Sequence, residues 1–225
     1  MRYMIRTEGV KRCFKTSGGD FWALKGIDME APKGALTILK GRSGSGKTTL
    51  LNILGVLDKP TEGKVLFDGS DIARMDERRR TRLRRMQIGF VFQSVALIPM
   101  MSAFENVEYA LRLTRYPGDR AERALECLKL VGLSQRMNHL PQELSGGEQQ
   151  RVAIARAIAH KPKVIFADEP TGELDTNTGL QVVKIFKDLT QAEGVTIIMT
   201  THDTGLMEIG DAVYELEDGE VVHGE

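Results

Sequence analysis

A glycine-rich loop at residues 41–48 has the residue types and the spacing of a phosphate-binding loop. Its sequence, Gly-Arg-Ser-Gly-Ser-Gly-Lys-Thr, fits the pattern G-x-x-x-x-G-K-S/T and lies between an apolar strand and a helix. In such a loop the backbone N–H groups surround a β-phosphate, the lysine reaches the β/γ oxygens and the threonine hydroxyl binds Mg²⁺. We therefore expect ATP to contact Gly41, Ser43, Gly44, Ser45, Gly46, Lys47, Thr48 and Thr49.

Two adjacent carboxylates, Asp168 and Glu169, follow an apolar segment at residues 164–167. The segment does not alternate, as expected for a strand that is buried on both faces of a parallel sheet. Adjacent acids after a strand are more often a helix cap, but the phosphate loop favours a catalytic interpretation. Because ligands collect at the carboxyl ends of such strands, we expect Asp168 to bind Mg²⁺ and Glu169 to polarise the attacking water as a base.

Polar residues also follow two other apolar strands. Gln93 comes after residues 88–92, and His202 comes after residues 195–201. A lone glutamine or histidine at such a position is usually structural. Two further strand ends directed at one phosphate site favour a role there, and His202 can donate a hydrogen bond to the γ-phosphate. The predicted catalytic set is Glu169, His202, Gln93 and Lys47.

The segment at residues 144–151, Leu-Ser-Gly-Gly-Glu-Gln-Gln-Arg, begins a predicted helix over residues 149–159. Ser145 and Glu148 have the spacing of a capping box, so an ordinary helix start is one interpretation. Gly146 and Gly147 argue against it, since each glycine costs up to about 1 kcal/mol relative to alanine. The pair makes sense where another backbone or a phosphate approaches the helix N-terminus, which is a ready anion site.

Charge and composition limit the class of protein. The chain has 225 residues, with 31 basic and 31 acidic side chains, so no global field favours nucleic acid. No run of 18 apolar residues and no signal-peptide pattern is present, so we expect no membrane span. Its 2 cysteines do not suggest a disulfide framework, which fits a reduced compartment.

The periodicity of the chain predicts how these motifs are positioned. Strands at residues 3–14 and 21–29 flank a turn, and strands alternate with helices from residue 35 onward. Alternation of this kind predicts an α/β fold with a mostly parallel sheet. Residues 102–144 have a helical pattern with breaks, which predicts a helical lobe inserted into the core. Residues 212–222 predict a final hairpin around an Asp-Gly turn.

Three further features have a structural and a functional interpretation. Phe14 ends the first strand, where core packing is the simpler assignment. Residues 78–85 are rich in arginine, and most such runs are solvated helix faces. We expect no nucleic acid there, and anionic lipid is a second option. Residues 95–101 are apolar and include two methionines, which suits either a buried loop or a groove for a partner helix.

Together these residues resemble the nucleotide-binding domain of ATP-binding cassette (ABC) ATPases over essentially the whole chain. The resemblance assigns residues 41–48 to the Walker A loop, Gln93 to the Q-loop and Asp168 and Glu169 to Walker B. It places the signature at residues 144–148, so that Ser145, Gly146, Gly147 and Glu148 contact ATP. It also places the D-loop at Leu174 and Asp175, the switch histidine at His202, the adenine-stacking aromatic at Phe14, and metal contacts at Thr48, Gln93 and Asp168.

The resemblance implies a P-loop NTPase (RecA-like) core with an N-terminal antiparallel β subdomain and an inserted α-helical subdomain. One domain would span residues 1–225, with the core at about 1–98 and 145–225 and the helical part at about 99–144. Residues 90–93, 97–99, 105–107 and 167–172 resemble the LolD, MacB and FtsE group. Phe14 in place of the usual tyrosine and Glu173 in place of asparagine depart from that group.

The family implies a head-to-tail homodimer in which the signature of one copy covers ATP on the other. It also implies an integral membrane permease subunit on a separate chain, and a peripheral position on the cytoplasmic face of the membrane. Members of the group power lipoprotein release, macrolide or peptide export, or division signalling. An FtsE-like regulator without transport stays open as an alternative. Two cassettes in one chain or a long coiled coil, typical of translation or chromosome members, are not present in this sequence.

Overall fold

A six-stranded sheet forms the centre of the molecule in the computed structural model, which describes residues 2–224. Its strand order is β10 (Glu220–Gly224), β9 (Ala212–Glu217), β3 (Leu36–Lys40), β8 (Thr196–Thr201), β7 (Val164–Asp168) and β6 (Ile88–Phe92). All neighbours from β9 to β6 are parallel, and β10 pairs with β9 in an antiparallel hairpin. The prediction of an α/β fold with a mostly parallel sheet is therefore confirmed.

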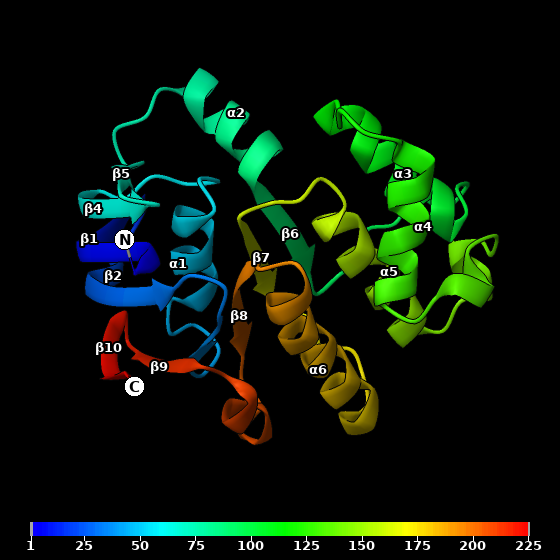
Figure 1. Ribbon diagram of the computed structural model, residues 1–225. Coiled ribbons are helices and arrows are strands. Elements are labelled where there is room, and N and C mark those ends of the chain that lie inside the picture. The colour runs from blue at the N-terminus through cyan, green and yellow to red at the C-terminus, as the bar shows by residue number, and fades with distance from the viewer. Residues whose placement is uncertain (1, 225) are drawn as a thin grey trace.

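The N-terminal segment forms a separate antiparallel sheet (Figure 1). Its order is β2 (Gly19–Pro32), β1 (Tyr3–Thr16), β4 (Glu62–Phe67) and β5 (Ser70–Asp71). The first hairpin is tighter than we predicted, since β1 continues to Thr16 and β2 begins at Gly19. The Thr16 hydroxyl donates a 2.8 Å hydrogen bond to the Gly19 carbonyl, which closes the turn early.

The helices cover both faces of the central sheet (Figure 1). Helix α1 (Lys47–Leu54) lies between the two sheets, in contact with β2, β7 and β8. Helix α6 (Thr176–Ala192) contacts β3 and β8 on the opposite face. The remaining helices are α2 (Glu77–Gln87), α3 (Ala103–Thr114), α4 (Arg120–Leu130) and α5 (Gly146–Ile158), with 3₁₀ turns at Ser134–Arg136, Pro141–Glu143 and Thr204–Ile209.

Helices α3 and α4 pack against each other and against α5, at the right of Figure 1. Residues 131–145 contain only short 3₁₀ turns, so the helical pattern expected there was too long. Gly132, two residues after the end of α4, adopts a φ of +72°, which prevents the helix from continuing. The division into a core and a helical subdomain at about residues 99–144 stays a prediction.

Strands β3, β7 and β8, in the middle of the central sheet, are buried on both faces, as expected for continuous apolar sequences. On β7, Ile165 and Ala167 join the cluster that includes α3–α6, whereas Val164 and Phe166 join the cluster around α1. Two apolar layers therefore enclose β7 and fix the position of Asp168, its last residue, and of Glu169, which follows it. Among the described residues, no helix is long and apolar enough to cross a membrane.

Candidate nucleotide site

The register of the central sheet brings the predicted strand-end residues to one edge. Phe92 lies opposite Asp168 on the neighbouring strand, and Ala167 lies opposite Met199, so Asp168 comes beside Thr200. Lys40, which immediately precedes the glycine-rich loop, lies opposite Thr201. Four sequence segments that are far apart therefore end at the same place, as the parallel arrangement predicts.

The glycine-rich loop requires glycine at two positions for steric reasons. A Cβ atom on Gly41 would lie 2.4 Å from the Leu216 carbonyl oxygen, and the φ of Gly41 is +155°. A Cβ atom on Gly46, whose φ is +104°, would lie 2.8 Å from the Ala23 carbonyl oxygen. The loop thus packs directly against the backbone of β2 and of the final hairpin.

Lys47 is folded into this loop and is only 4% exposed. Its ammonium donates hydrogen bonds of 2.7 Å to the Gly41 carbonyl and 3.0 Å to the Arg42 carbonyl. The same nitrogen lies 3.6 Å from Glu169 Oε1. A buried ammonium needs a partner of opposite charge. Glu169 is that partner for Lys47, which is the first residue of α1.

A cavity of about 280 Å³ opens beside the loop. It brings together eight of the predicted residues, and it adds Phe21 and Ala23, which were not predicted. Phe21 lies opposite Phe14 in the β1–β2 register and is 56% exposed. The cavity is lined by Phe14, Phe21, Ala23, Ser43, Gly44, Gly46, Lys47, Thr48, Thr49 and Glu169.

Asp168 accepts two hydrogen bonds on one carboxylate oxygen. Thr48 Oγ1 donates to its Oδ1 over 3.2 Å, and Thr200 Oγ1 donates to the same atom over 2.7 Å. The Thr200 hydroxyl also accepts a 2.8 Å hydrogen bond from the Glu169 N–H. Thr200 is fully buried and was missed from the sequence, because only the β7–β8 register reveals its contact with both acids.

The Thr48 hydroxyl and the Asp168 carboxylate fit a magnesium site. Mg²⁺ in phosphate sites usually takes one or two carboxylate or hydroxyl ligands from the protein and completes its shell with phosphates and water. Within residues 2–224, no cluster of three or more His, Cys, Asp or Glu side chains forms a complete metal cage. The pair of Thr48 and Asp168 therefore fits a metal ion that takes most of its ligands from nucleotide oxygens and water.

Glu169 lies between a lysine and a histidine. Its Oε2 is 3.4 Å from His202 Nδ1, while its other oxygen faces Lys47. His202 is 62% exposed, so it can reorient toward a ligand at the edge of the sheet. Glu169 itself adopts a φ of +43°, a left-handed conformation that is uncommon for a residue with a side chain and often marks functional positions.

Gln93 does not line the cavity in this structure. It is exposed, and its side-chain nitrogen would lie 3.1 Å from a Cβ atom on Gly172, so it rests on the backbone that follows Glu169. The structure therefore places Gln93 at the correct edge of the sheet but brings it to the Walker B segment rather than into the cavity. Its predicted contacts with metal and γ-phosphate stay predictions.

The signature segment lies outside the lining of this cavity. Helix α5 begins at Gly146, three residues earlier than expected, with the predicted capping box in place. Glu148 N–H donates to Ser145 Oγ over 3.2 Å, and Ser145 N–H donates to Glu148 Oε2 over 2.9 Å. The second bond is the main cause that lowers the pKa of the Glu148 carboxyl below its ordinary value.

The two signature glycines have different environments. A Cβ atom on Gly147 would lie 2.3 Å from Thr178 Cγ2, so α6 of the same chain requires glycine there. A Cβ atom on Gly146 would meet only Leu174 Cδ2, at an ordinary 3.7 Å, and Gly146 is exposed. Gly146 therefore has the room for an outside group that we predicted at both glycines, whereas at Gly147 that prediction was wrong, because Thr178 of the same chain fills the space.

The predicted D-loop is attached to the same place. Asp175 caps α6 by accepting hydrogen bonds from the N–H groups of Asn177 and Thr178 and from the Thr178 hydroxyl, which lies 2.6 Å away. The Thr178 hydroxyl is the largest cause that lowers the pKa of the Asp175 carboxyl. Thr178 thus contacts both Asp175 and the signature helix, and it joins the two segments into one surface.

The arginine run forms α2 and divides into two groups. Arg80 and Arg84 turn inward and donate hydrogen bonds to the Val56 carbonyl, each over 2.7 Å. The other arginines of the helix are exposed, along an open space of about 910 Å³. We place no nucleotide there, because that space is lined by residues 76–86 alone and none of the predicted site residues reaches it.

Comparison with known proteins identifies the family. Residues 24–172 match the family model described as ABC transporter. The chain belongs to this family. It is 45% identical over 224 residues to an uncharacterized ABC transporter ATP-binding protein of Methanocaldococcus jannaschii, covering 97% of this chain and 95% of the relative. A solved dimer of that archaeal cassette, in a post-hydrolysis state with ADP and Pi, superimposes with a TM-score of 0.88 at 43% identity, covering 99% of this chain and 98% of the other.

Two named relatives define the group. The lipoprotein-releasing system ATP-binding protein LolD of Bacteroides thetaiotaomicron is 44% identical over 219 residues, covering 97% of this chain and 99% of LolD. The macrolide export protein MacB of Syntrophobacter fumaroxidans is 42% identical over 222 residues, or 96% of this chain but 31% of MacB. The ABC protein is therefore an ATP-binding, ATP-hydrolysing transporter subunit of the LolD/MacB-like type, which confirms the predicted family and enzyme class.

Proposed function

We propose that this ATPase binds Mg·ATP in the cavity beside the glycine-rich loop and drives a separate membrane subunit. The observation that carries the proposal is the meeting of Lys47, Thr48, Asp168 and Glu169 at one cavity edge, although they come from segments more than 100 residues apart in the sequence. Lys47 would bind phosphate oxygens, and the Thr48 hydroxyl and the Asp168 carboxylate would hold the metal. Bound Mg²⁺ would neutralise charge on the phosphates.

Glu169 is the proposed general base. Glu169 lines the cavity, its backbone N–H is held by the hydrogen bond to Thr200, and its carboxylate contacts Lys47. From this position it would accept a proton from the attacking water, while the nearby His202 would donate a hydrogen bond to the γ-phosphate. Gln93 would couple the occupancy of the nucleotide site to the segment at residues 95–101, which it directly precedes.

A second copy of the chain would complete the site. Gly146 and Ser145 are exposed at the N-terminus of α5 and lie outside the cavity lining of their own chain. A helix N-terminus attracts anions through its free N–H groups, and the related archaeal cassette is a dimer. We infer a head-to-tail homodimer in which residues 144–148 of one copy cover the triphosphate that is bound by the other.

The proposed role at the membrane is based on the names of the relatives. LolD and MacB are named for lipoprotein release and macrolide export, so we propose release or export work at the cytoplasmic face of a membrane, through a permease on another chain. A regulator that moves a membrane partner without transport is the alternative. Reconstitution with the partner separates the two, because only a transporter moves cargo during hydrolysis. The balanced charge of the chain favours no nucleic acid partner.

The dimer is tested by light scattering on the Glu169→Gln protein, which should bind ATP without hydrolysing it. We expect more dimer with Mg·ATP than with Mg·ADP at micromolar protein. Adding Gly146→Arg should abolish the ATP-dependent dimer and leave the fold intact, because position 146 has room for a side chain. Equal monomer populations with ATP and ADP, in the free subunit and with its membrane partner, would contradict the composite site.

A further inference from the structure

Phe14 is covered on one side by a cation. The guanidinium carbon of Arg12 lies 4.4 Å from the centroid of the Phe14 ring. Arg12 and Phe14 are two residues apart on β1, and side chains with that spacing share one face of a strand. Phe14 lines the cavity beside the glycine-rich loop, whereas Arg12 does not. The Phe14 ring therefore borders the cavity, and the guanidinium that covers one of its faces does not.

Arg12 is held in that position by a carboxylate from another part of the chain. Its Nε donates to Asp58 Oδ2 over 2.8 Å, and its Nη2 donates to Asp58 Oδ1 over 3.0 Å. This bidentate arrangement fixes the plane of the guanidinium as well as its charge. The pair is partly buried, with side-chain exposures of 24% for Arg12 and 31% for Asp58.

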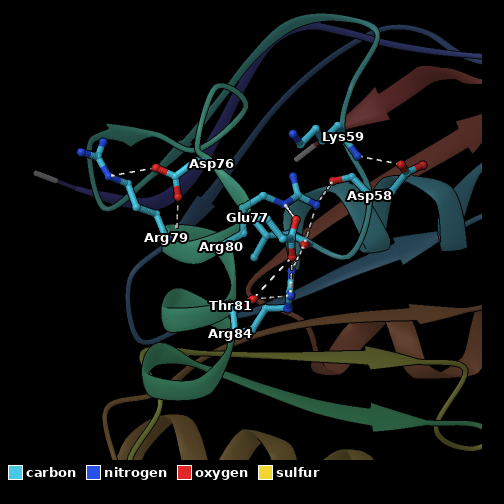
Figure 2. Close-up of polar contacts among 9 residues, drawn as sticks. Asp58, Lys59, Asp76, Glu77, Arg79, Arg80, Thr81 and Arg84 are labelled. Atoms are coloured by element: carbon cyan, nitrogen blue, oxygen red, sulfur yellow. Dashed lines mark hydrogen bonds and ion pairs between the residues drawn. The ribbon is translucent and has the colours of Figure 1, made fainter.

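Asp58 is itself fixed by α2. Arg80, which is 3% exposed, donates hydrogen bonds to the Asp58 carbonyl over 3.0 Å and to the Val56 carbonyl over 2.7 Å. Figure 2 shows Arg80 and Arg84 of α2 directed toward the segment that carries Asp58. Since α2 leads directly into β6, a continuous set of contacts runs from the strand before Gln93 to the Phe14 ring.

A phenylalanine in this position needs such support. Its ring has no hydroxyl through which a hydrogen bond could fix it, and Phe14 is only half-buried. A guanidinium over one face restricts the ring through cation–π attraction. It also draws electron density toward that face, which favours stacking of an electron-rich purine on the opposite face.

We propose that Arg12, oriented by Asp58, is a positioning residue of the base site, which holds the Phe14 ring so that its free face accepts the adenine of ATP. The inference rests on the proposed nucleotide function and adds a residue that acts through Phe14 without touching the nucleotide. It predicts a stacked series of guanidinium, phenyl ring and purine. Affinity for the base should therefore depend on Arg12, whereas affinity for the phosphates should not.

The test is a double-mutant cycle measured by calorimetry with ATP and with inorganic tripolyphosphate as separate probes. Arg12→Ala should raise the dissociation constant for ATP roughly three- to tenfold, since partly buried cation–π contacts are of that size. Binding of tripolyphosphate should not change. Arg12→Lys should be intermediate, because it keeps the charge and loses the planar bidentate fork. In a Phe14→Ala background, Arg12→Ala should have no further effect on ATP.

Lys11→Ala is the matched control, because it removes one positive charge from the neighbouring position of β1, where Lys11 pairs with Glu62. Thermal unfolding of each variant separates loss of binding from loss of fold. If Phe14→Ala weakens ATP binding but Arg12→Ala and Arg12→Lys do not, the inference is wrong and the proposed base site is retained. If Arg12→Ala raises the dissociation constant for ATP by the same factor in the wild-type and Phe14→Ala backgrounds, Arg12 does not act through the ring and the inference is wrong. If Phe14→Ala itself leaves ATP binding unchanged, the proposed base site fails and the inference fails with it.

Discussion

The Thr200 hydroxyl donates a 2.7 Å hydrogen bond to Asp168 Oδ1. Thr200 belongs to β8 and Asp168 to β7, so this bond joins the ends of two neighbouring strands at the point where both lead into the site. The same hydroxyl accepts the Glu169 N–H. One buried side chain therefore fixes the proposed metal ligand and the backbone of the proposed base.

Replacement of Thr200 with valine tests this arrangement. Thr200→Val keeps the shape of the side chain but leaves the Glu169 N–H without a partner and leaves Asp168 Oδ1 with only the 3.2 Å hydrogen bond from Thr48. We expect a loss of about 1–3 kcal/mol in the free energy of unfolding, because unsatisfied polar groups are costly, and a lower hydrolysis rate. Thr37→Val on β3 is the control, since the buried Thr37 hydroxyl has no hydrogen-bond partner among residues 2–224. Equal stability losses for the two variants would contradict the account.

The two signature glycines should respond differently to alanine. Gly147→Ala places a methyl group against Thr178 Cγ2, so we expect it to destabilise the free monomer by about 1–3 kcal/mol. Gly146→Ala meets no clash and should be neutral or stabilising by up to about 1 kcal/mol. Thr178→Ser removes the clashing methyl and keeps the hydroxyl bond to Asp175, so it should rescue Gly147→Ala. Denaturant unfolding measures all three, and an absence of rescue would refute the packing explanation.

A carboxylate between two lysines gives a pH-dependent contact. Hydrogen bonds from Lys163 and Lys33 lower the pKa of Asp68 from its ordinary value of 3.8 to about 2. A lowered folded-state pKa contributes stability above the unfolded pKa and loses it as the pH falls toward the folded value. The stability gap between wild type and Asp68→Asn should therefore be full above about pH 5 and shrink between about pH 4 and pH 2. Urea unfolding across that range measures it, and a constant gap would argue against this pairing.

The apolar segment at residues 95–101 presents one methionine to solvent. Asn106, which is 1% exposed, donates hydrogen bonds to the carbonyls of Ile98 and Met101, so the loop is held to α3. Met100 is 85% exposed, whereas Met101 is half-buried. Met100→Glu therefore tests docking of the membrane subunit more cleanly than a change at Met101.

We expect Met100→Glu to weaken copurification with the membrane subunit, because burying an unpaired carboxylate costs several kcal/mol. Its stability and its nucleotide binding as a free subunit should equal those of wild type. Val222→Glu on β10, at a residue that is 48% exposed, is the control and should copurify normally. Undiminished copurification of Met100→Glu would place the docking surface elsewhere.

The sequence predicted the elements of the site because its motifs are local. The loop at residues 41–48, the two acids at the end of β7 and the capping box of Ser145 each lie within one short segment, and each was found where expected. Thr200 and Phe21 were missed, because their importance depends on which residues face each other across strands that are joined only in the fold. The same limit concealed Arg12, whose partner Asp58 lies 46 residues away.

Gly147 shows a second limit of sequence reasoning. Its pattern correctly indicated a close approach to the helix end, but the group that approaches is Thr178 of the same chain. A sequence pattern predicts that space is needed and does not identify what fills it. The extent of the helical segment was also overestimated, since Gly132 ends α4 and the residues before α5 form only short 3₁₀ turns.

The most direct test of the account is the steady-state hydrolysis of ATP by Glu169→Gln. The variant should bind Mg·ATP with unchanged affinity and lose turnover by about 100- to 10,000-fold, because a positioned general base contributes that much. Glu122→Gln, an exposed position in α4, makes the same chemical change away from the cavity and should hydrolyse ATP normally. Turnover close to wild type in Glu169→Gln would contradict the assignment of the base and, with it, the proposed site.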